Sequence, residues 1–212
     1  MQQTGMKRGH ACLISYAETA DRSFPLILVV GREPNEDLPP SEATGPYDFR
    51  TSKNCAFWNV AYSLLGSVGT PPRSTAQMKA QAEAAAASPI LFADALPLTL
   101  RHAAKNKAAQ RLAISDAAIE RHVAAVFSHR ELIDRVRVII LSGLGPSFER
   151  SVAVYRRLAE ARSVALAELP FFYPTNMPAI RERLGKELRN HLADVLSDFD
   201  HHARLMPASA VA

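Results

Sequence analysis

The chain has 212 residues, of which 48% are hydrophobic and 22% are charged, and its formal net charge is +4. This composition is typical of a globular protein with a sizeable core, and no apolar run reaches the roughly 20 residues needed to cross a bilayer. The first ten residues are polar, which argues against a signal peptide. The two cysteines, Cys12 and Cys55, are too few for a disulfide scaffold or a four-cysteine metal site, and they indicate a reducing, cytoplasmic compartment.

Apolar runs and helix-prone segments alternate along the chain. Buried strands are predicted over 25–30, 90–93, 135–141 and 164–169. Helices are predicted over 54–65, 74–87, 115–129, 146–162 and 178–205, with Ser115 as an N-cap. This alternation predicts an α/β fold: a three-layer α/β/α domain with a central, mostly parallel four-stranded sheet. We expect a single domain over residues 1–206 and a flexible tail over 207–212.

The segments that follow the predicted strands carry most of the candidate chemistry. In parallel sheets of this kind, ligands bind outside the carboxyl ends of the strands. Those ends are Gly31-Arg-Glu-Pro-Asn35, Asp94, Ser142-Gly-Leu-Gly145 and Tyr173-Pro-Thr-Asn176. The segment 31–49 is too polar for a core, and long loops in compact domains are usually functional. We therefore expect the binding site at this edge of the sheet.

Individual residues at this edge allow more than one interpretation. Glu33 follows a buried strand directly, where a carboxylate can act as a general base or orient a water molecule, although a solvated loop glutamate is the alternative. Phe49 lies in a polar loop and has little reason to be core, whereas Phe57 and Trp58 fit the core of the next helix. The segment 173–176 offers hydroxyl and amide groups for a polar ligand or a phosphate.

Other signals in the sequence are weak or absent. The chain has no phosphate-binding loop, no dinucleotide fingerprint and no nucleophile elbow. His201 and His202 are adjacent, so they do not share a helix face, and we predict no metal site. Two groups of basic residues are either solvated faces or footprints for a polyanion. They are Arg101, Lys105, Lys107 and Arg111, and then Arg156, Arg157 and Arg162.

The ordered set of motifs resembles the uracil-DNA glycosylase superfamily, most closely its mismatch-specific thymine/uracil branch. The matching segments are Gly31-Arg-Glu-Pro-Asn35, Gly45-Pro-Tyr-Asp-Phe49, Asn54-Cys-Ala-Phe-Trp58, Phe92-Ala-Asp94, Ser142-Gly-Leu-Gly145 and Tyr173-Pro-Thr-Asn-Met177. Members of the superfamily flip a base out of DNA and hydrolyse its N-glycosidic bond. The resemblance implies a DNA-repair hydrolase whose partner is DNA with a damaged or mismatched base. We expect a monomer that needs no cofactor and no membrane.

The resemblance also implies a role for each matching position. Catalysis would fall to Glu33, which would orient the water, and to Tyr173, which replaces the His or Asn of the second motif. Phe49 would stack on the base and Asp94 would face its hydrogen-bonding edge. The base-binding residues are Gly31, Phe49, Asn54 and Asp94. The DNA-binding residues are Arg50, Lys53, Pro174, Thr175 and Asn176.

Three departures from the family pattern bear on the substrate. Glu33 is one methylene longer than aspartate, and Tyr173 cannot become a cation. An ionised Asp94 only accepts hydrogen bonds, so it would leave the O4 carbonyl of uracil unpaired, and a base that presents N–H groups, such as a deaminated purine, fits better. Two alternatives remain open. The chain is a superfamily member that binds nucleic acid or a nucleotide without base excision, or an unrelated α/β protein that matches these short motifs by chance.

Overall fold

Four apolar runs form the centre of one parallel sheet. They are β3 (Leu26–Gly31), β5 (Ile90–Asp94), β7 (Val136–Ser142) and β8 (Ala165–Leu169). Their spatial order is β5-β3-β7-β8, and all three pairings are parallel. Each strand matches its predicted range to within one residue, so the prediction of an α/β fold with four central parallel strands is confirmed. The computed structural model describes residues 6–8, 14–15, 19, 22–32, 47–48, 56–100 and 106–205.

Strand β3 is the centre of this sheet because all six of its residues are buried and it pairs on both sides. A strand buried on both faces is a continuous aliphatic run, and Leu-Ile-Leu-Val-Val-Gly has that pattern. Val29 lies opposite Phe92 of β5 and Ile140 of β7. Gly31 lies opposite Asp94, so the carboxyl ends of β3 and β5 stop at the same level.

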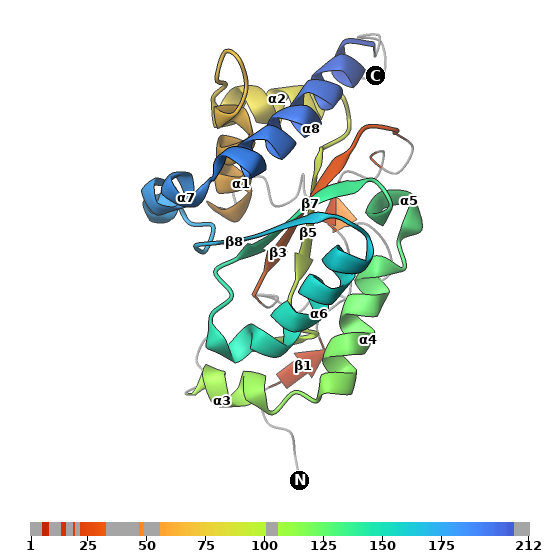
Figure 1. The fold of residues 1–212 in the computed structure, drawn as a ribbon, viewed down its shortest axis with the longest axis vertical. Coiled ribbons are helices and arrows are strands. Elements are labelled where there is room, and N and C mark those ends of the chain that lie inside the picture. Colours follow the sequence, from red (N-terminus) through yellow and green to blue (C-terminus); the bar gives the residue numbers. More distant parts are fainter. Residues whose placement is uncertain are drawn as a thin grey trace.

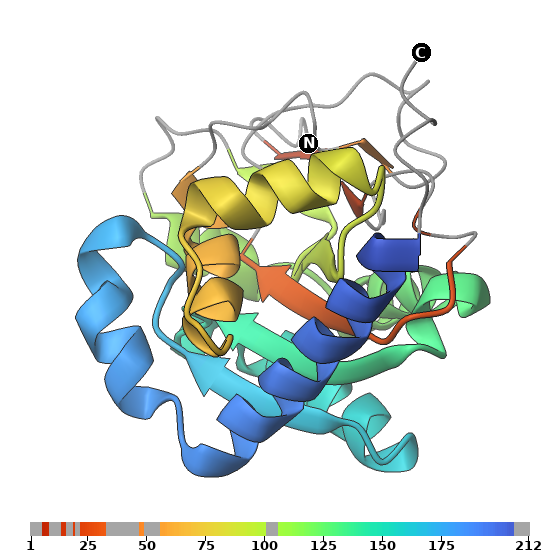
Figure 2. The same cartoon turned by 90° about the horizontal axis from the view of Figure 1, so that it is seen from above.

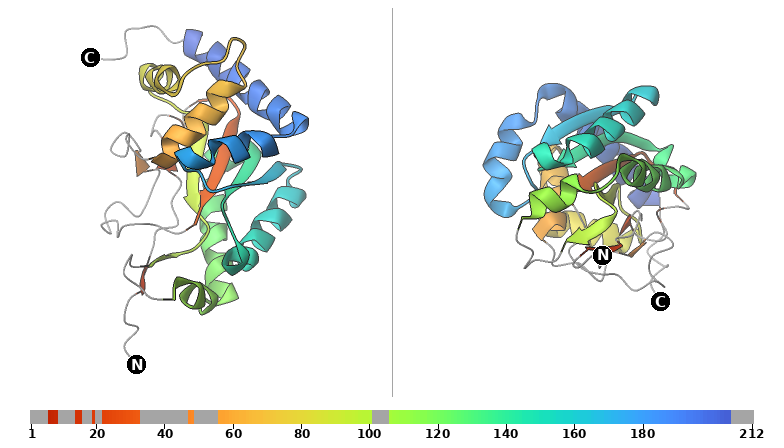
Figure 3. Two further views of the ribbon diagram at one scale, coloured as in Figure 1. Left: turned by 90° about the vertical axis from the view of Figure 1, so that its left-hand side faces the viewer. Right: turned by 90° about the horizontal axis from the view of Figure 1, so that it is seen from below.

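Helices cover both faces of the sheet, as the predicted three-layer arrangement requires (Figures 1 and 2). On one face lie α1 (Ala56–Ser67), α2 (Thr75–Ala84) and α8 (Lys186–Leu205), and on the other lie α4 (Asp116–Phe127) and α6 (Glu149–Ala161). Figure 3 shows the same two layers from the side and from below. The connection that leaves β3 passes over the first face, and the connection that leaves β7 passes over the second. The order in which strands are added to the sheet therefore reverses between β3 and β7, which is where sheets of this kind bind ligands.

Several short elements were not predicted. Strands β2 (Ile14–Ser15) and β4 (Tyr47–Asp48) extend the sheet beyond β5, and β1 (Met6–Arg8) pairs with β6 (Leu98–Leu100). Two short helices, α3 (Lys107–Leu112) and α5 (Arg130–Ile133), precede and follow α4. Two or three residues are too few to show the alternation by which a strand is predicted.

Helices α4 and α2 each begin after a serine whose side chain caps the helix. Ser115 accepts a hydrogen bond from the Ala118 amide, so its prediction as an N-cap is confirmed. Ser74 accepts from the Gln77 amide while the Gln77 side chain accepts from the Ser74 amide, which is a capping box at the start of α2.

The prediction of one helix over 178–205 is wrong, because the chain forms α7 (Met177–Arg183) and then α8. Leu184 interrupts the helix with a ψ of 82° and buries its side chain in the core. Arg189 compensates for the break by donating from Nε to the Leu184 carbonyl at 3.1 Å. Gly185 follows directly and is a helix-stop signal, but the apolar periodicity continues through the break.

The turn after β7 requires a glycine at one of its two glycine positions. Gly143 has a φ of +65°, and a Cβ placed there would overlap Phe171, whose backbone nitrogen would lie 2.8 Å away. Gly145 has a φ of −82°, and a Cβ placed there would meet no atom within 4 Å. The first glycine lets the chain pass beside Phe171, and the second has no such requirement.

We predict that Gly143→Ala destabilises the protein by about 2–4 kcal/mol, because the left-handed backbone and the overlap with Phe171 both carry a cost. The matched control Gly145→Ala should change the free energy of unfolding by less than about 0.5 kcal/mol. Urea denaturation of the two variants measures the difference. Equal midpoints for the two variants would contradict this account of the turn.

Candidate functional site

Two of the predicted base-binding residues lie side by side at the edge of the sheet. Gly31 and Asp94 end neighbouring strands in register, and the Asp94 Oδ1 atom lies 3.4 Å from the position that a Cβ on residue 31 would occupy. The same Cβ would lie 2.7 Å from the Phe92 ring. Any larger residue at position 31 would therefore displace Phe92 and crowd the carboxylate.

An aromatic cluster lies next to this carboxylate, on the face of the sheet that α1 covers. Phe92 is two residues before Asp94, so both side chains point to the same face. The ring centroid of Phe57 lies 4.7 Å from that of Phe92 and 5.4 Å from that of Phe172, and Trp58 lies 6.1 Å from Phe92. Phe57 and Trp58 thus belong to the core, as predicted. The cluster is an apolar neighbour for a ligand beside Asp94.

A buried hydroxyl holds the loop that follows β8. Ser142 ends β7 with its side chain fully buried, and its Oγ accepts a hydrogen bond from the Phe172 amide at 2.8 Å. The next amide, that of Gly143, donates to the Leu169 carbonyl at 2.8 Å. The ends of β7 and β8 are therefore joined, which fixes where the segment 173–176 begins.

The segment 173–176 forms a single turn of 3-10 helix, η5 (Pro174–Asn176), before α7. Tyr173 is 50% exposed, and Pro174 and Thr175 are exposed as well. Asn176 uses its own side chain inside the loop, because Nδ2 donates to the Phe171 carbonyl at 2.8 Å. The segment thus presents a tyrosine ring and a threonine hydroxyl to solvent from an internally bonded turn.

Arg32 spans the point between β3 and β7 at which the strand order reverses. Its Nε donates to the Gly143 carbonyl at 3.0 Å, and its guanidinium lies 4.6 Å from the centre of the Phe171 ring. The end of β3 is thereby tied to the turn after β7 and to the loop after β8. The sequence shows only that Arg32 follows a strand, so it gave no signal for this role.

A histidine and a tyrosine lie behind Asp94, on the opposite face of the sheet. The Nε2 atom of His122 lies 2.7 Å from the Asp94 carbonyl oxygen. Burial lowers the pKa of His122, so the imidazole is neutral at neutral pH. Tyr155 is fully buried, and burial followed by the charge of Asp94 raises the pKa of its hydroxyl, which stays protonated.

A hollow of about 270 Å³ opens beside the turn after β7. Its walls come from the ends of β7 and β8 and from α7. The lining includes Gly143, Leu144, Gly145, Glu168, Pro170 and Arg183. The hollow widens the carboxyl edge of the sheet on the side away from Asp94.

The second group of basic residues is a solvated face whose charges are paired. Arg156 bonds to Glu149 at 3.0 Å and to Glu168 at 2.5 Å. Arg157 bonds to Glu120 at 3.2 Å, and Arg162 bonds to Asp134 at 2.8 Å. Of the two interpretations of this group, the structure favours the solvated face over a polyanion footprint.

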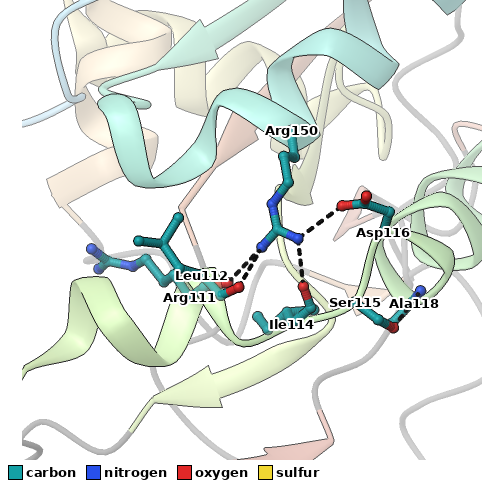
Figure 4. Close-up of polar contacts among 7 residues, drawn as sticks. All are labelled: Arg111, Leu112, Ile114, Ser115, Asp116, Ala118 and Arg150. Carbon is teal, nitrogen blue, oxygen red and sulfur yellow. Dashed lines mark hydrogen bonds and ion pairs between the residues drawn. The ribbon is translucent and has the colours of Figure 1, made fainter.

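The guanidinium group of Arg150 also bonds to other groups of the protein (Figure 4). Nη2 donates to the carbonyls of Arg111 and Leu112 at the end of α3, at 3.2 Å and 3.0 Å. Nη1 donates to the Ile114 carbonyl at 2.7 Å and to Asp116 at 2.8 Å. One side chain of α6 thus caps α3 and fixes the start of α4, the helix that carries His122.

Five predicted site residues lie outside the described residues: Glu33, Phe49, Arg50, Lys53 and Asn54. Arg101, Lys105 and the predicted tail, 207–212, lie outside them too. Within the described ranges no three His, Cys, Asp or Glu side chains gather closely enough to hold a metal ion. Nor does any helix in those ranges have the length and apolarity to span a membrane.

Comparison of the sequence with protein-family models finds no match, and comparison with curated proteins finds none either. Among solved structures, the chain is similar to a putative uracil DNA glycosylase from Methanosarcina acetivorans, determined by solution NMR. The two sequences are 17% identical, the match covers 93% of this chain and 98% of the other, and the TM-score is 0.42.

We predict that Ser142→Ala loosens the loop that carries Tyr173. Loss of the Oγ acceptor leaves the buried Phe172 amide without a partner, which costs about 1–3 kcal/mol and speeds exchange of that amide. Hydrogen exchange measured by NMR checks the effect residue by residue. The control Ser67→Ala removes a hydroxyl that donates to the Leu64 carbonyl and should leave the Phe172 amide unchanged. Unaltered exchange at Phe172 in Ser142→Ala would contradict the role assigned to the hydroxyl.

Proposed function

We propose that the protein hydrolyses the N-glycosidic bond of a damaged or deaminated base in DNA, in the manner of the uracil-DNA glycosylase superfamily and of its mismatch-specific branch. One observation carries the proposal. Asp94 and Gly31 adjoin at the carboxyl edge, beside an aromatic cluster, on the same edge from which the segment 173–176 projects. A flipped base needs an apolar neighbour and a polar group for its edge, and this edge of the sheet offers both.

Few groups would take part in the proton transfers of this hydrolysis. Glu33 would orient a water molecule toward the sugar C1′ and take up its proton as the new C1′–O bond forms. The C1′–N bond breaks, and its electron pair leaves with the base, which is then protonated by solvent. The carboxylate of Glu33 would also stabilise the positive charge that develops on the sugar. No metal and no organic cofactor has a part in these steps.

Asp94 is the group that would select the base. An ionised carboxylate accepts hydrogen bonds and donates none. A base with N–H groups toward Asp94, such as hypoxanthine or xanthine, would satisfy the carboxylate. Uracil would set its O4 carbonyl against the carboxylate, and a mismatched polar pair of this kind can lower the specificity ratio by several orders of magnitude.

Contacts to the rest of the nucleic acid would come from the exposed turn and the basic residues around it. Thr175 and Asn176 can bond to phosphate oxygens, and Arg50, Lys53 and Arg181 can add electrostatic attraction. The exposed ring of Tyr173 can stack on a neighbouring base. Phe49 would stack on the flipped base itself, with Asn54 at the same pocket.

Binding without excision is the second candidate, and the exposure of Tyr173 favours it. A tyrosine that is 50% exposed and carries no positive charge gives little stabilisation to a departing base anion. The same exposure suits a stacking contact in a protein that holds nucleic acid without cleaving it.

The first experiment measures base release from labelled oligonucleotides that contain uracil, hypoxanthine, xanthine or mismatched thymine. We predict release of one of these bases, and a loss of at least about 100-fold in Glu33→Ala, because a general base contributes that much or more. Glu36→Ala, a change of the same kind three residues further on, is the control and should retain activity. Release that survives in Glu33→Ala contradicts the mechanism. DNA binding without release of any base supports the second candidate.

A second experiment tests the role of Asp94 in base selection. Asn replaces one carboxylate oxygen with an N–H donor while the shape of the side chain is kept. We predict that Asp94→Asn raises the ratio of uracil release to hypoxanthine release by about tenfold or more, since the new donor pairs with O4. The ratio of kcat/KM for the two oligonucleotides measures the change. An unaltered ratio would show that Asp94 does not face the base.

A further inference from the structure

His122 is the most buried histidine in the described part of the chain, at 4% exposure. It lies on α4 in line with Ile119, Val123 and Val126, which form the apolar face of that helix. Burying an imidazole in such surroundings costs free energy unless its N–H is hydrogen-bonded. The partner of that N–H therefore indicates what the ring does.

The partner is the backbone carbonyl of Asp94. A carbonyl oxygen only accepts, so the Nε2 atom, 2.7 Å away, carries the hydrogen. The neutral ring then has an unprotonated Nδ1, which is buried and has no hydrogen-bond partner among the residues that the structure describes. The bond to Asp94 is thus the one polar contact of this imidazole in the described residues.

The other end of the same peptide group is held as well. The Ala95 amide donates to the carbonyls of Gly31 and Arg32, at 3.0 Å and 3.1 Å. The Asp94–Ala95 peptide is therefore fixed at its oxygen by α4 and at its hydrogen by the end of β3. Rotation of this peptide would break both contacts together.

The two contacts act from opposite faces of the sheet. The Asp94 carboxylate lies near Gly31 and on the same face as Phe92, toward α1, whereas His122 reaches the carbonyl from α4. Tyr155 also lies behind the strand end, and both groups are neutral, so neither adds a formal charge there. His122 can therefore affect the carboxylate through its position alone.

We propose that His122 is a positioning residue that sets the base selectivity of the site, by fixing the Asp94–Ala95 peptide and with it the direction of the Asp94 carboxylate. The inference rests on the function proposed above. A displacement of roughly 1 Å at a reading group is enough to lose a hydrogen bond and can change rates about 100-fold. A buried ring that holds the peptide from behind prevents such a displacement.

The test compares two substitutions at position 122 in the full chain. Gln offers an N–H at a similar reach, whereas Leu fills a similar volume without a donor. We expect His122→Leu to lower the hypoxanthine-to-uracil ratio of kcat/KM by about tenfold or more, and His122→Gln to keep it within about threefold. Exchange of the Ala95 amide should speed up in the Leu variant alone.

A matched control separates selectivity from stability. Val123→Ala removes buried volume from the same helix without touching Asp94, so it should lower stability and keep the ratio. If the wild type is active and His122→Leu keeps the same hypoxanthine-to-uracil ratio, the inference on His122 is overturned while the proposed function stands. Equal loss of the ratio in both His122 variants would overturn it too, because the donor would then be irrelevant. A wild type that releases no base overturns the proposed function, and the selectivity claim with it.

Discussion

The register of the three central strands is the constraint on which the candidate site depends. Leu26–Gly31 is buried on both faces, and burial of each aliphatic side chain contributes about 1.5–3 kcal/mol. A slip by one residue would turn every side chain of a strand to the other face. It would place Asp94 among the core residues beneath α4. The apolar residues of the strands thus determine where the carboxylate lies, although none of them belongs to the site.

Buried polar side chains fix the loops at the ends of the strands, in addition to the strand register. At the amino end of β5, the buried Ser88 hydroxyl bonds to the Tyr62 hydroxyl at 2.9 Å and accepts from the Ile90 amide at 3.1 Å, and the Ser88 amide donates to Thr19 at 3.1 Å. At the carboxyl edge, Ser142 and His122 are buried in the same way, and each bonds to the backbone of a segment that carries a proposed site residue. The loops at this edge are therefore held from inside the core.

The sequence predicted the layers of this fold better than its loops and its site. Apolar runs predicted all four central strands, and parallel topology then brought Gly31 and Asp94 together. Gly185 follows the break at Leu184, but the apolar pattern continues across it, so one helix was predicted where two exist. The positions of Arg32 and His122 depend on partners far along the chain, such as Gly143 and the carbonyl of residue 94. Local sequence patterns do not indicate such contacts. For the same reason the sequence could not show whether Arg157 belongs to a solvated face or to a polyanion footprint, because its partner Glu120 lies on another helix.

Four arginine side chains bond to other groups of the protein, and this affects how the formal net charge of the chain is interpreted. Arg150, Arg156, Arg157 and Arg162 are four of the 25 basic residues, and each already bonds to carbonyls or carboxylates of the protein. A cation that is neutralised within the fold releases few counterions when it meets a phosphate. On the proposed substrate, these four arginines would therefore contribute little to the attraction of DNA. The carboxylates that pair with them are neutralised as well, so the formal charge of +4 resides on other basic residues of the chain, and attraction to a phosphate backbone would come from those.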